Sequence, residues 1–375
     1  VHDVEVMGDQ LPLMGTDIDG CDDETLDIEI FPDRPDLLSG ETLAYAIRPF
    51  LHGAPAAPEI QTVSSGIKMH VEPSLSAIRP VVMGAVVKGV VLPDDAEEQE
   101  SFIKALMDHQ EKLHFALGRG RKRASIGVHD LAALQPPFNV VAASGTRSFI
   151  PLGEETAMNM TTILTTHPKG VDYAHLLEGM TSYPLIVDAN DDVLSFPPII
   201  NGNHTTVTTK TRDFFVDVTG WDQRACESSL MLICLQLQER GGKIETVEVT
   251  TCEGQIITTP NGAGKSHLVP EELVTGLLGR EFSDDELNHA INRMGGTFVG
   301  RKDAPKDSPK RASKMSEVSE GGNLLEFKMP RWRFDILHPE DLVGDIAIGN
   351  GCEDLGEDQP VTQLTAQPRP DHNMR

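Results

Sequence analysis

The sequence lacks paired cysteines, a long apolar run and a surplus of positive charge, and each absence excludes a class of protein. No two cysteines form a C-x-x-C pair, which argues against zinc knuckles and redox dithiols and favours a reducing compartment. No apolar stretch approaches the roughly 20 residues that span a bilayer. Residues 1–20 carry acids and prolines where a signal peptide has a basic flank and an apolar core, so we expect a cytoplasmic protein that does not associate with membranes.

Positive charge is scarce, because 32 lysines and arginines face 58 acidic residues and the net charge is −26. An indiscriminate nucleic-acid binder needs a basic surface, so contacts to nucleic acid are expected only at local patches. One patch is GRGRKR at 118–123, with four cations in six residues. It is either a solvated helix end, where cations suit the helix dipole, or a set of RNA phosphate contacts. The candidate RNA contacts are Arg119, Arg121, Lys122 and Arg123.

Length and periodicity predict an α+β protein of several domains. A chain of 375 residues is long enough for two or three domains with their own cores. Apolar and alternating stretches predict strands at 24–31, 80–92 and 213–220. A long helix at 223–240 runs into a Gly-Gly turn and a further strand, which is typical of a mixed sheet covered by helices.

Capping signals predict where three further helices begin. Ser39 precedes apolar residues at four-residue spacing, and Ser101 stands at the head of a helix expected over 101–118. Ser283 and Glu286 form a capping box for a helix within 282–296. The polar stretch 300–322 is expected to be a loop.

Residues 259–266 read TPNGAGKS and match the end of the phosphate-binding loop G-x-x-x-x-G-K-[ST]. The first glycine of that pattern is replaced by Thr259, which cannot readily take the positive φ that the turn needs. The helix that should follow is also doubtful, since Pro270 suits only a first helical turn. We therefore interpret the stretch as a turn between two domains.

Two further stretches are candidates for a ligand site. LSFPPIINGNHTTVTTKTRDFFVDVTG at 194–220 combines a rigid proline pair with amides and hydroxyls, which suits either a ligand pocket or a threonine-rich hairpin. His129 and Asp130 form either an acid/base pair or, more often for such neighbours, a turn. No Ser-His-Asp order or nucleophile elbow accompanies them.

Asp335, Asp341 and Asp345 lie within eleven residues, and the last two share a face of a predicted helix. Carboxylates clustered in this way suit Mg²⁺, which takes one or two of them and keeps several waters. A capping aspartate beside solvated acids explains the same spacing, and on spacing alone it is the favoured explanation.

Seven stretches resemble, in the same order, the beta subunit of phenylalanyl-tRNA synthetase in its archaeal and eukaryotic form. Together they cover most of residues 24–355. The stretches are IEIFPDRPDLLS (28–39), RPVVMGAVVKGV (79–90), HQEKLHFALGRGRKRASIGVHDL (109–131), VLSFPPIINGNHTTVT (193–208), FVDVTGWD (215–222), RGGKIETVEV (240–249) and RWRFDILHPEDLVGDIAIGNG (331–351).

The resemblance implies an organisation into domains. It places an N-terminal α+β piece with a linker at 1–75, a mixed-sheet editing domain at 76–260 and a small helical, winged-helix-like domain at 261–355. Residues 356–375 would begin a further module that packs on the alpha subunit. By this comparison the chain is expected to be a fragment of a longer subunit.

The resemblance also implies a function. The family's alpha subunit charges tRNA(Phe) with the help of ATP, in a heterotetramer of two alpha and two beta subunits. The editing domain hydrolyses mischarged Tyr-tRNA(Phe), because an apolar pocket cannot strongly reject an isostere that adds only a hydroxyl. The alternatives are a free-standing deacylase and an RNA- or protein-binding module without activity.

The family's site residues map onto two parts of this sequence. The editing positions are Ser195, Asn201, Asp217 and Thr219, and no side chain among them is an obvious nucleophile, so a positioned water is expected to attack. The implied Mg²⁺ ligands are Asp335, Asp341 and Asp345. The family pattern has a fourth acid where this sequence has Gly344, which weakens the expected metal site.

Overall fold

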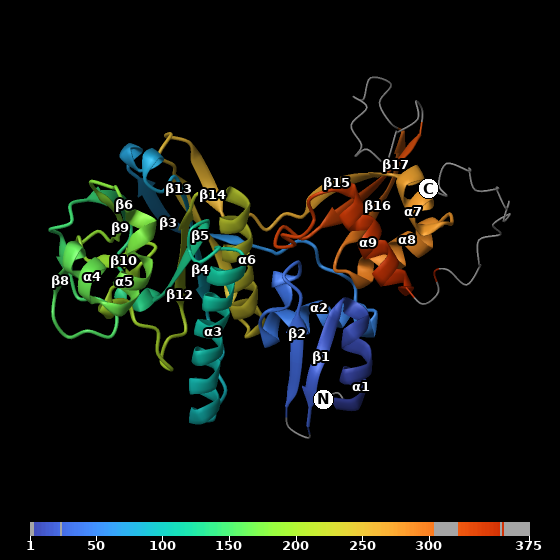
Figure 1. Ribbon diagram of the computed structural model, residues 1–375, viewed down its shortest axis with the longest axis horizontal. Helices are drawn as coiled ribbons and strands as arrows, with labels where there is room; N and C mark the ends of the chain where they lie inside the picture. The colour runs from blue at the N-terminus through green and yellow to red at the C-terminus, as the bar shows by residue number, and fades with distance from the viewer. Residues whose placement is uncertain (1–3, 23–24, 304–321, 353–354, 356–375) are drawn as a thin grey trace, which may run out of the picture.

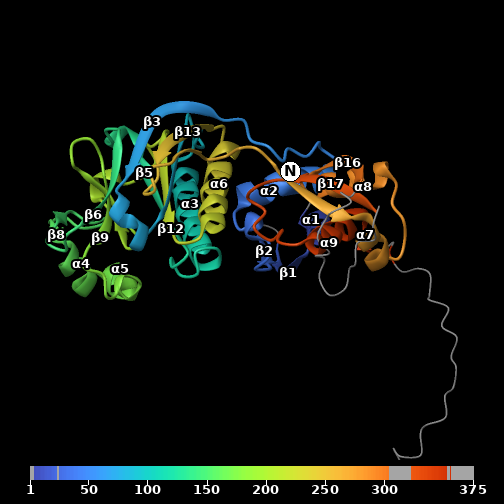
Figure 2. The same ribbon diagram turned by 90° about the horizontal axis from the view of Figure 1, so that it is seen from above.

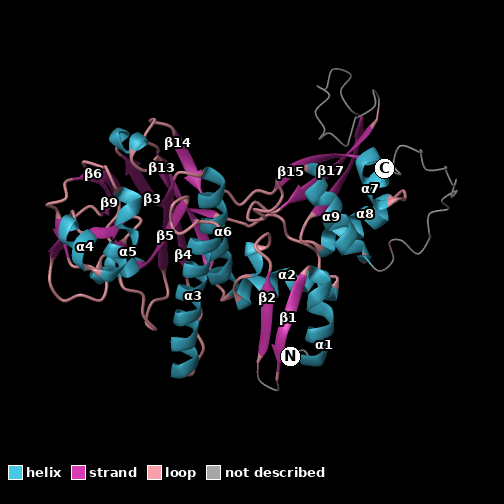
Figure 3. Ribbon diagram, viewed as in Figure 1, coloured by secondary structure: helices cyan, strands magenta, loops and turns pink. Residues whose placement is uncertain are grey.

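The computed structural model describes residues 4–22, 25–303, 322–352 and 355. Figure 1 shows three units: a large sheet with helices, a small N-terminal unit below, and a C-terminal unit beside it. Each unit combines helices with a mixed or antiparallel sheet, which confirms the predicted α+β class (Figure 3). Within the described residues, no helix is long and apolar enough to cross a membrane.

The N-terminal unit is a two-stranded antiparallel hairpin packed against helices. Ser39 caps α2 as predicted, since its hydroxyl accepts a hydrogen bond from the Thr42 N–H. Strand β2 alternates between half-buried and exposed residues, with Leu26, Ile28 and Ile30 turned inward. The elements are α1 (Val4–Gln10), β1 (Thr16–Cys21), β2 (Leu26–Ile30) and α2 (Gly40–His52).

The central unit is built on one mixed sheet in the order β11-β10-β9-β6-β3-β13-β4-β12-β5, with β14 beside β13. β3 runs parallel to both β13 and β6, and the other neighbours are antiparallel. The strands are β3 (Val63–Val71), β4 (Val81–Lys88), β5 (Ala124–Asp130), β6 (Phe138–Ala143), β9 (Tyr183–Val187), β10 (Val193–Phe196), β11 (Ile200–Asn201), β12 (Phe214–Gly220), β13 (Lys243–Thr250) and β14 (Ile256–Thr259).

The place of β3 moves the first domain boundary. The sequence placed residues 1–75 in the N-terminal piece and its linker, but Val63–Val71 forms an inner strand of the large sheet. The strand pairs with β13, some 180 residues later in the chain, so no local pattern could assign it. The N-terminal unit therefore ends with α2, and residues 53–62 connect it to the sheet.

Helices α3 (Ala96–Ala116) and α6 (Gln223–Glu239) cover one face of the sheet. Figure 2 shows them between the sheet and the other two units. α3 begins six residues before the position that a Ser101 cap would give. Its cap is Asp95, whose carboxylate accepts hydrogen bonds from the N–H groups of Glu97 and Glu98, and acids in a first turn suit the helix dipole.

A small subdomain follows β6 on the far side of the sheet. It holds the short hairpin β7 (Ser148–Phe149) and β8 (Met158–Asn159), then α4 (Met160–Thr166) and α5 (Pro168–Tyr173). Its apolar side chains join those of β9 and β10 in a separate core that contains Phe149, Ile163 and Phe196. The subdomain therefore stands next to the turn that carries the proline pair.

The C-terminal unit packs three helices on an antiparallel sheet of order β15-β17-β16. The predicted capping box of α8 is present, with Ser283 and Glu286 bonded to each other's backbone N–H groups. Residues 300–303, expected in a loop, extend β16, and 304–321 lie outside the described residues. The elements are β15 (Lys265–Pro270), α7 (Glu271–Leu278), α8 (Asp284–Arg293), β16 (Thr297–Asp303), β17 (Asn323–Met329) and α9 (Pro339–Asn350).

The stretch TPNGAGKS connects the central and C-terminal units, as predicted, and has no phosphate-loop geometry. Thr259 ends β14, and its hydroxyl donates to Gly84 O at 2.7 Å. Lys265 and Ser266 open strand β15, where a phosphate loop would have the first turn of a helix.

Candidate functional site

A cavity of about 410 Å³ opens where the two ends of the large sheet approach each other. Asn201 on β11, the first strand in the sheet order, donates from Nδ2 to Val128 O on β5, the last strand, at 3.5 Å. The surface of the cavity is mostly apolar, although about half of the lining residues have polar or charged side chains. The apolar lining includes Ile126, Val128, Leu152, Ile199 and Val207, and the polar lining includes Ser125, Ser195, Asn201, Thr205 and Asp217.

Three of the four predicted editing residues line this cavity. Ser195 and Asn201 lie opposite each other on β10 and β11, and Asp217 reaches the cavity from the middle of β12. Asp217 is 1% exposed and Ser195 is 4% exposed. Thr219 lies two residues beyond Asp217 on the same face of β12, but it is buried behind the lining.

Asp217 is held by a histidine rather than by a neighbour in sequence. His129 Nε2 lies 2.7 Å from Asp217 Oδ2, and His129 Nδ1 lies 2.8 Å from the Thr205 hydroxyl. The pairing of His129 with Asp130 does not form, because consecutive strand residues point to opposite faces. Asp130 instead accepts a hydrogen bond from the Thr211 hydroxyl at 2.8 Å.

A buried arginine lies behind the cavity wall, and sequence reasoning missed it. Arg79 donates to the Thr219 hydroxyl at 2.7 Å and to the Ser125 hydroxyl at 3.0 Å, and no carboxylate contacts it among the described residues. Burial lowers the pKa of Arg79 to about 10, although Cys226 and Asp217 oppose the shift. A single arginine before a proline has no signal in sequence that would have marked it.

Arg121, one of the four predicted RNA contacts, points into the protein. Its guanidinium donates to Pro198 O at 3.1 Å and Ile199 O at 2.9 Å, pairs with Glu111 at 2.6 Å, and stacks on Tyr173. Its backbone φ of 66° lies in the left-handed region. Arg121 therefore holds the proline turn of the cavity that it lines, and its guanidinium is already bonded to two carbonyls and one carboxylate.

The other three cations of the segment are more accessible. Arg119 and Lys122 are exposed, and Arg123 is half-buried with its Nε 3.9 Å from Asp222. Glu111 adds negative charge at the cavity mouth. Burial would raise the pKa of Glu111, but His114, Arg121 and Lys169 outweigh it and lower that pKa to about 2.

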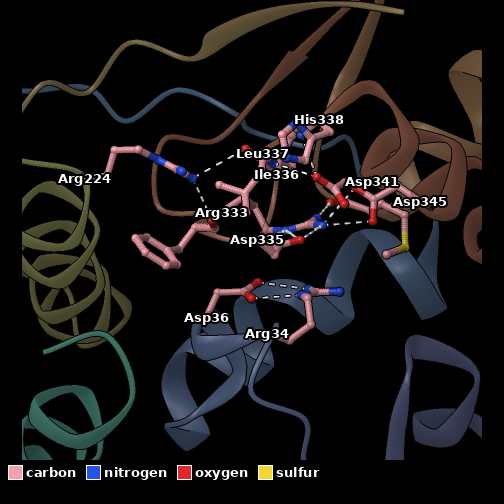
Figure 4. A network of polar contacts seen from close by, with 12 residues as sticks. Arg34, Asp36, Arg224, Arg333, Asp335, Ile336, Leu337, His338, Asp341 and Asp345 are labelled. Atoms are coloured by element: carbon pink, nitrogen blue, oxygen red, sulfur yellow. Dashed lines mark hydrogen bonds and ion pairs between the residues drawn. The ribbon is translucent and has the colours of Figure 1, made fainter. Parts of the chain in front are cut away.

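The acids expected to bind Mg²⁺ are engaged with other groups (Figure 4). Arg333 Nη2 lies 2.6 Å from Asp335 Oδ2 and 2.9 Å from Asp345 Oδ1, so one guanidinium joins both carboxylates. Asp341 caps α9, since its Oδ2 accepts from the N–H groups of Leu337 and His338, each at 2.7 Å.

These residues do not fit a divalent ion. Mg²⁺ needs oxygen ligands directed at one point with near-octahedral geometry. Here Arg333 takes the position between Asp335 and Asp345, and Gly344 adds no carboxylate. Across the described ranges, no group of three or more His, Cys, Asp or Glu side chains is arranged to hold a metal.

A second ion pair extends this charged cluster into the N-terminal unit. Arg34 and Asp36 form two hydrogen bonds of 2.9 Å and lie below Arg333 in Figure 4. Burial opposes the charge of Arg333, but Asp335 and Asp345 outweigh it and hold its pKa well above the usual range. Arg224 of α6 donates to Phe334 O at 2.7 Å, so the segment around Arg333 contacts all three units.

Comparison with known proteins relates the central and C-terminal units to one family. A family model described as the B3/4 domain matches residues 95–248, and one described as the tRNA synthetase B5 domain matches residues 268–352. The crystal structure of an N-terminal fragment of the phenylalanyl-tRNA synthetase beta subunit from Pyrococcus horikoshii matches with a TM-score of 0.79 and 30% identity, covering 93% of this chain and 94% of that fragment. This chain belongs to the phenylalanyl-tRNA synthetase beta-subunit family.

Two curated relatives illustrate how far this similarity extends. The phenylalanine–tRNA ligase beta subunit of Methanococcoides burtonii is 40% identical over 358 residues, which are 96% of this chain and 62% of the relative. That of Methanosarcina acetivorans is 40% identical over 373 residues, 100% of this chain and 64% of the relative. The chain thus spans slightly less than two thirds of the length of these beta subunits, and the predicted family is confirmed.

Proposed function

We propose that this chain serves in a phenylalanine–tRNA ligase as the part of the beta subunit that hydrolyses Tyr-tRNA(Phe), and that the hydrolysis takes place in the cavity beside Asp217. The observation that carries the proposal is a cavity with a mostly apolar surface whose lining includes the buried polar side chains of Ser195, Thr205 and Asp217. Apolar side chains such as Ile199 and Val207 suit an aromatic ring, and Asp217 offers a hydrogen-bond acceptor to a hydroxyl or an ammonium group.

The chemistry that fits this lining is attack by water on the ester that joins tyrosine to the 3′-terminal ribose. Ser125 and Ser195 are the serines of the lining, and within the described residues neither has a histidine as hydrogen-bond partner. A serine without a base is a weak nucleophile. The bond from the carbonyl carbon to the ribose oxygen breaks, and tyrosine and tRNA with a free hydroxyl leave.

The test is a deacylation assay with Tyr-tRNA(Phe). Asp217→Asn keeps the shape of the side chain and removes its charge, and we expect hydrolysis to fall about 10- to 100-fold, the effect of losing a hydrogen bond to a charged group. The matched control is Asp108→Asn on α3, which is exposed and has no hydrogen bond within the described part of the chain. Equal rates for the wild type and Asp217→Asn would refute the assignment.

The partner of this chain, in our proposal, is an alpha subunit that charges tRNA(Phe) with ATP in the cytoplasm, in a complex of two alpha and two beta subunits. Gel filtration with and without the alpha subunit tests the assembly. A chain that deacylates Tyr-tRNA(Phe) but does not bind the alpha subunit would be a free-standing deacylase. A chain that binds tRNA but leaves the ester intact would be a binding module.

For RNA contacts we propose the exposed cations Arg119 and Lys122, with Arg123 beside them. Each phosphate contact contributes close to one unit to the slope of log affinity against log salt. Replacing Arg119 and Lys122 together by alanine should therefore reduce the slope for tRNA(Phe) by roughly 1.5 to 2. An unchanged slope would show that the RNA binds elsewhere.

A further inference from the structure

We infer that His129 is a positioning residue for Asp217: it binds one carboxylate oxygen and so directs the other to the substrate as a hydrogen-bond acceptor. The inference rests on the proposed function, because Asp217 must act on an aminoacyl-tRNA for its orientation to matter. His129 does not itself line the cavity, so it acts only through its partner.

The contacts of His129 leave it a single orientation. The ring is fully buried, and its two nitrogens have two different partners, Asp217 Oδ2 at 2.7 Å and Thr205 Oγ1 at 2.8 Å. An ionised carboxylate can only accept, so Nε2 must carry a proton toward Asp217. Nδ1 is bonded to the Thr205 hydroxyl, whose oxygen also lies 3.0 Å from Gly202 O. The single hydroxyl proton goes to one of these two acceptors, and in either case the hydroxyl keeps its bond to Nδ1. Turning the ring would break both hydrogen bonds inside the protein.

Only one carboxylate oxygen of Asp217 is held by a hydrogen bond from the protein. Within the described residues, Oδ2 is bonded to His129 and Oδ1 has no hydrogen-bond partner. Asp217 is nevertheless part of the cavity lining. Oδ1 is not among the buried side-chain atoms that lack a partner, so it is open to the cavity. Hydrogen bonds to an ionised carboxylate are stronger than those between neutral groups, so a ligand donor that reaches Oδ1 gains affinity. The aminoacyl ester has two such donors, the phenol hydroxyl and the ammonium group.

Gly127 makes room for this arrangement. It lies directly opposite Asp217 in the β5–β12 register, two residues before His129 on the same face of β5. A Cβ atom at position 127 would overlap Asp217 Oδ2 and would lie 2.7 Å from His129 Nε2. Strand β5 thus supplies both the group that holds the carboxylate and the space that the carboxylate needs.

Two substitutions of His129 test the contributions of its two ring nitrogens separately. The amide of His129→Gln reaches the position of Nε2 and can still donate to Asp217, whereas the amide of His129→Asn reaches only the position of Nδ1. We expect His129→Asn to lower kcat/KM for Tyr-tRNA(Phe) hydrolysis about 10- to 100-fold, and His129→Gln to retain most of it. A role in packing alone would make the two variants alike, and that result would overturn the inference.

A double-mutant cycle tests whether His129 acts through Asp217. In the Asp217→Asn background, His129→Asn should have little further effect, because the group that it positions is already altered. Full additivity of the two changes would contradict the inference. The same variants identify the substrate group that donates to Asp217. If that group is the phenol hydroxyl, the ratio of the hydrolysis rates for Tyr-tRNA(Phe) and Phe-tRNA(Phe) should be lower in Asp217→Asn than in the wild type. If it is the ammonium group, which both substrates have, the ratio should be the same in both proteins.

A spectroscopic measurement keeps the inference separate from the proposed function. In the wild-type chain labelled with ¹⁵N at histidine, the His129 Nε2 proton should show the downfield shift of a hydrogen bond to a carboxylate, and Asp217→Ala should abolish that shift. If the wild type does not hydrolyse Tyr-tRNA(Phe), the proposed function fails while this spectrum still tests the pair. An Nε2 signal that is unaffected by Asp217→Ala would overturn the pairing.

Discussion

Replacing Arg333 by methionine should destabilise the junction of the three units more than any neighbouring charge removal. Arg333 is 5% exposed and donates to both Asp335 and Asp345 and to Met294 O at 3.0 Å. Removing one partner of a buried ion pair leaves a charge without compensation and costs about 3–5 kcal/mol. Methionine is similar in length and apolar, so the loss reports mainly on charge and hydrogen bonds.

The matched control is Arg331→Met, two residues earlier in the same segment. Arg331 is half-buried and pairs with Glu227 at 3.2 Å, and a pair with that access to water contributes about 1 kcal/mol. Urea unfolding followed by fluorescence compares the two variants. Trp332 is 3% exposed between them and reports on the junction, and a Trp221→Phe background removes the signal of the other tryptophan of the chain.

The pH dependence of the Arg333→Met variant has a definite sign. Burial, the largest influence, raises the pKa of Asp345, and Arg333 is the main influence that lowers it. Without Arg333 that pKa rises further, so the folded state binds the proton more tightly than the unfolded state. The resulting stability is fully present below the unfolded pKa of 3.8 and is lost as pH rises through the folded pKa. The deficit should therefore be largest near neutral pH and smaller near pH 4.

The effect of metal ions on the stability of the wild type and of Arg333→Met tests whether Arg333 takes the place of a cation. In the wild type the guanidinium lies between Asp335 and Asp345, so neither EDTA nor millimolar Mg²⁺ should move the urea midpoint. In Arg333→Met the two carboxylates have lost their cation, and Mn²⁺ or Mg²⁺ should restore part of the stability by binding the folded state. A wild-type midpoint that falls on chelation, or an Arg333→Met loss no larger than that of Arg331→Met, would refute this reasoning.

Three further predictions follow from individual contacts. Arg121→Met removes the two hydrogen bonds to the carbonyls of the proline turn, so deacylation should fall about tenfold while the affinity for tRNA(Phe) stays unchanged. A loss of affinity equal to that of Arg119→Ala would contradict the role of Arg121 in holding the proline turn. Ser283→Ala should cost α8 about 1 kcal/mol, measured as faster hydrogen exchange of its first amides, and unchanged exchange would show that the cap is dispensable. Isothermal titration of the chain with ATP should give no heat of binding, since Lys265 and Ser266 lie in a strand; micromolar affinity would reverse our interpretation of that stretch.

Much of the secondary structure could be predicted because its causes are local. Ser39, Ser283 and Glu286 satisfy helix N–H groups within three residues of themselves, so their pattern can be read without knowing the fold. The one misplaced helix start, at Ser101 instead of Asp95, arose where two capping residues compete over a short distance. The boundary at residue 75 was misplaced for the opposite reason, since β3 is defined only by strands far away in sequence.

The sequence by itself determined the α+β class, the family, and the residues Ser195, Asn201 and Asp217 of the cavity. Only the tertiary structure decided the partners of the charged groups. His129 pairs with Asp217, 88 positions away, and Arg121 binds Ile199, 78 positions away. Arg333 joins Asp335 and Asp345 where sequence spacing suggested a metal. The physical reason is that the interaction of charges depends on distance and burial in three dimensions, and neither is encoded in the spacing of residues along the chain.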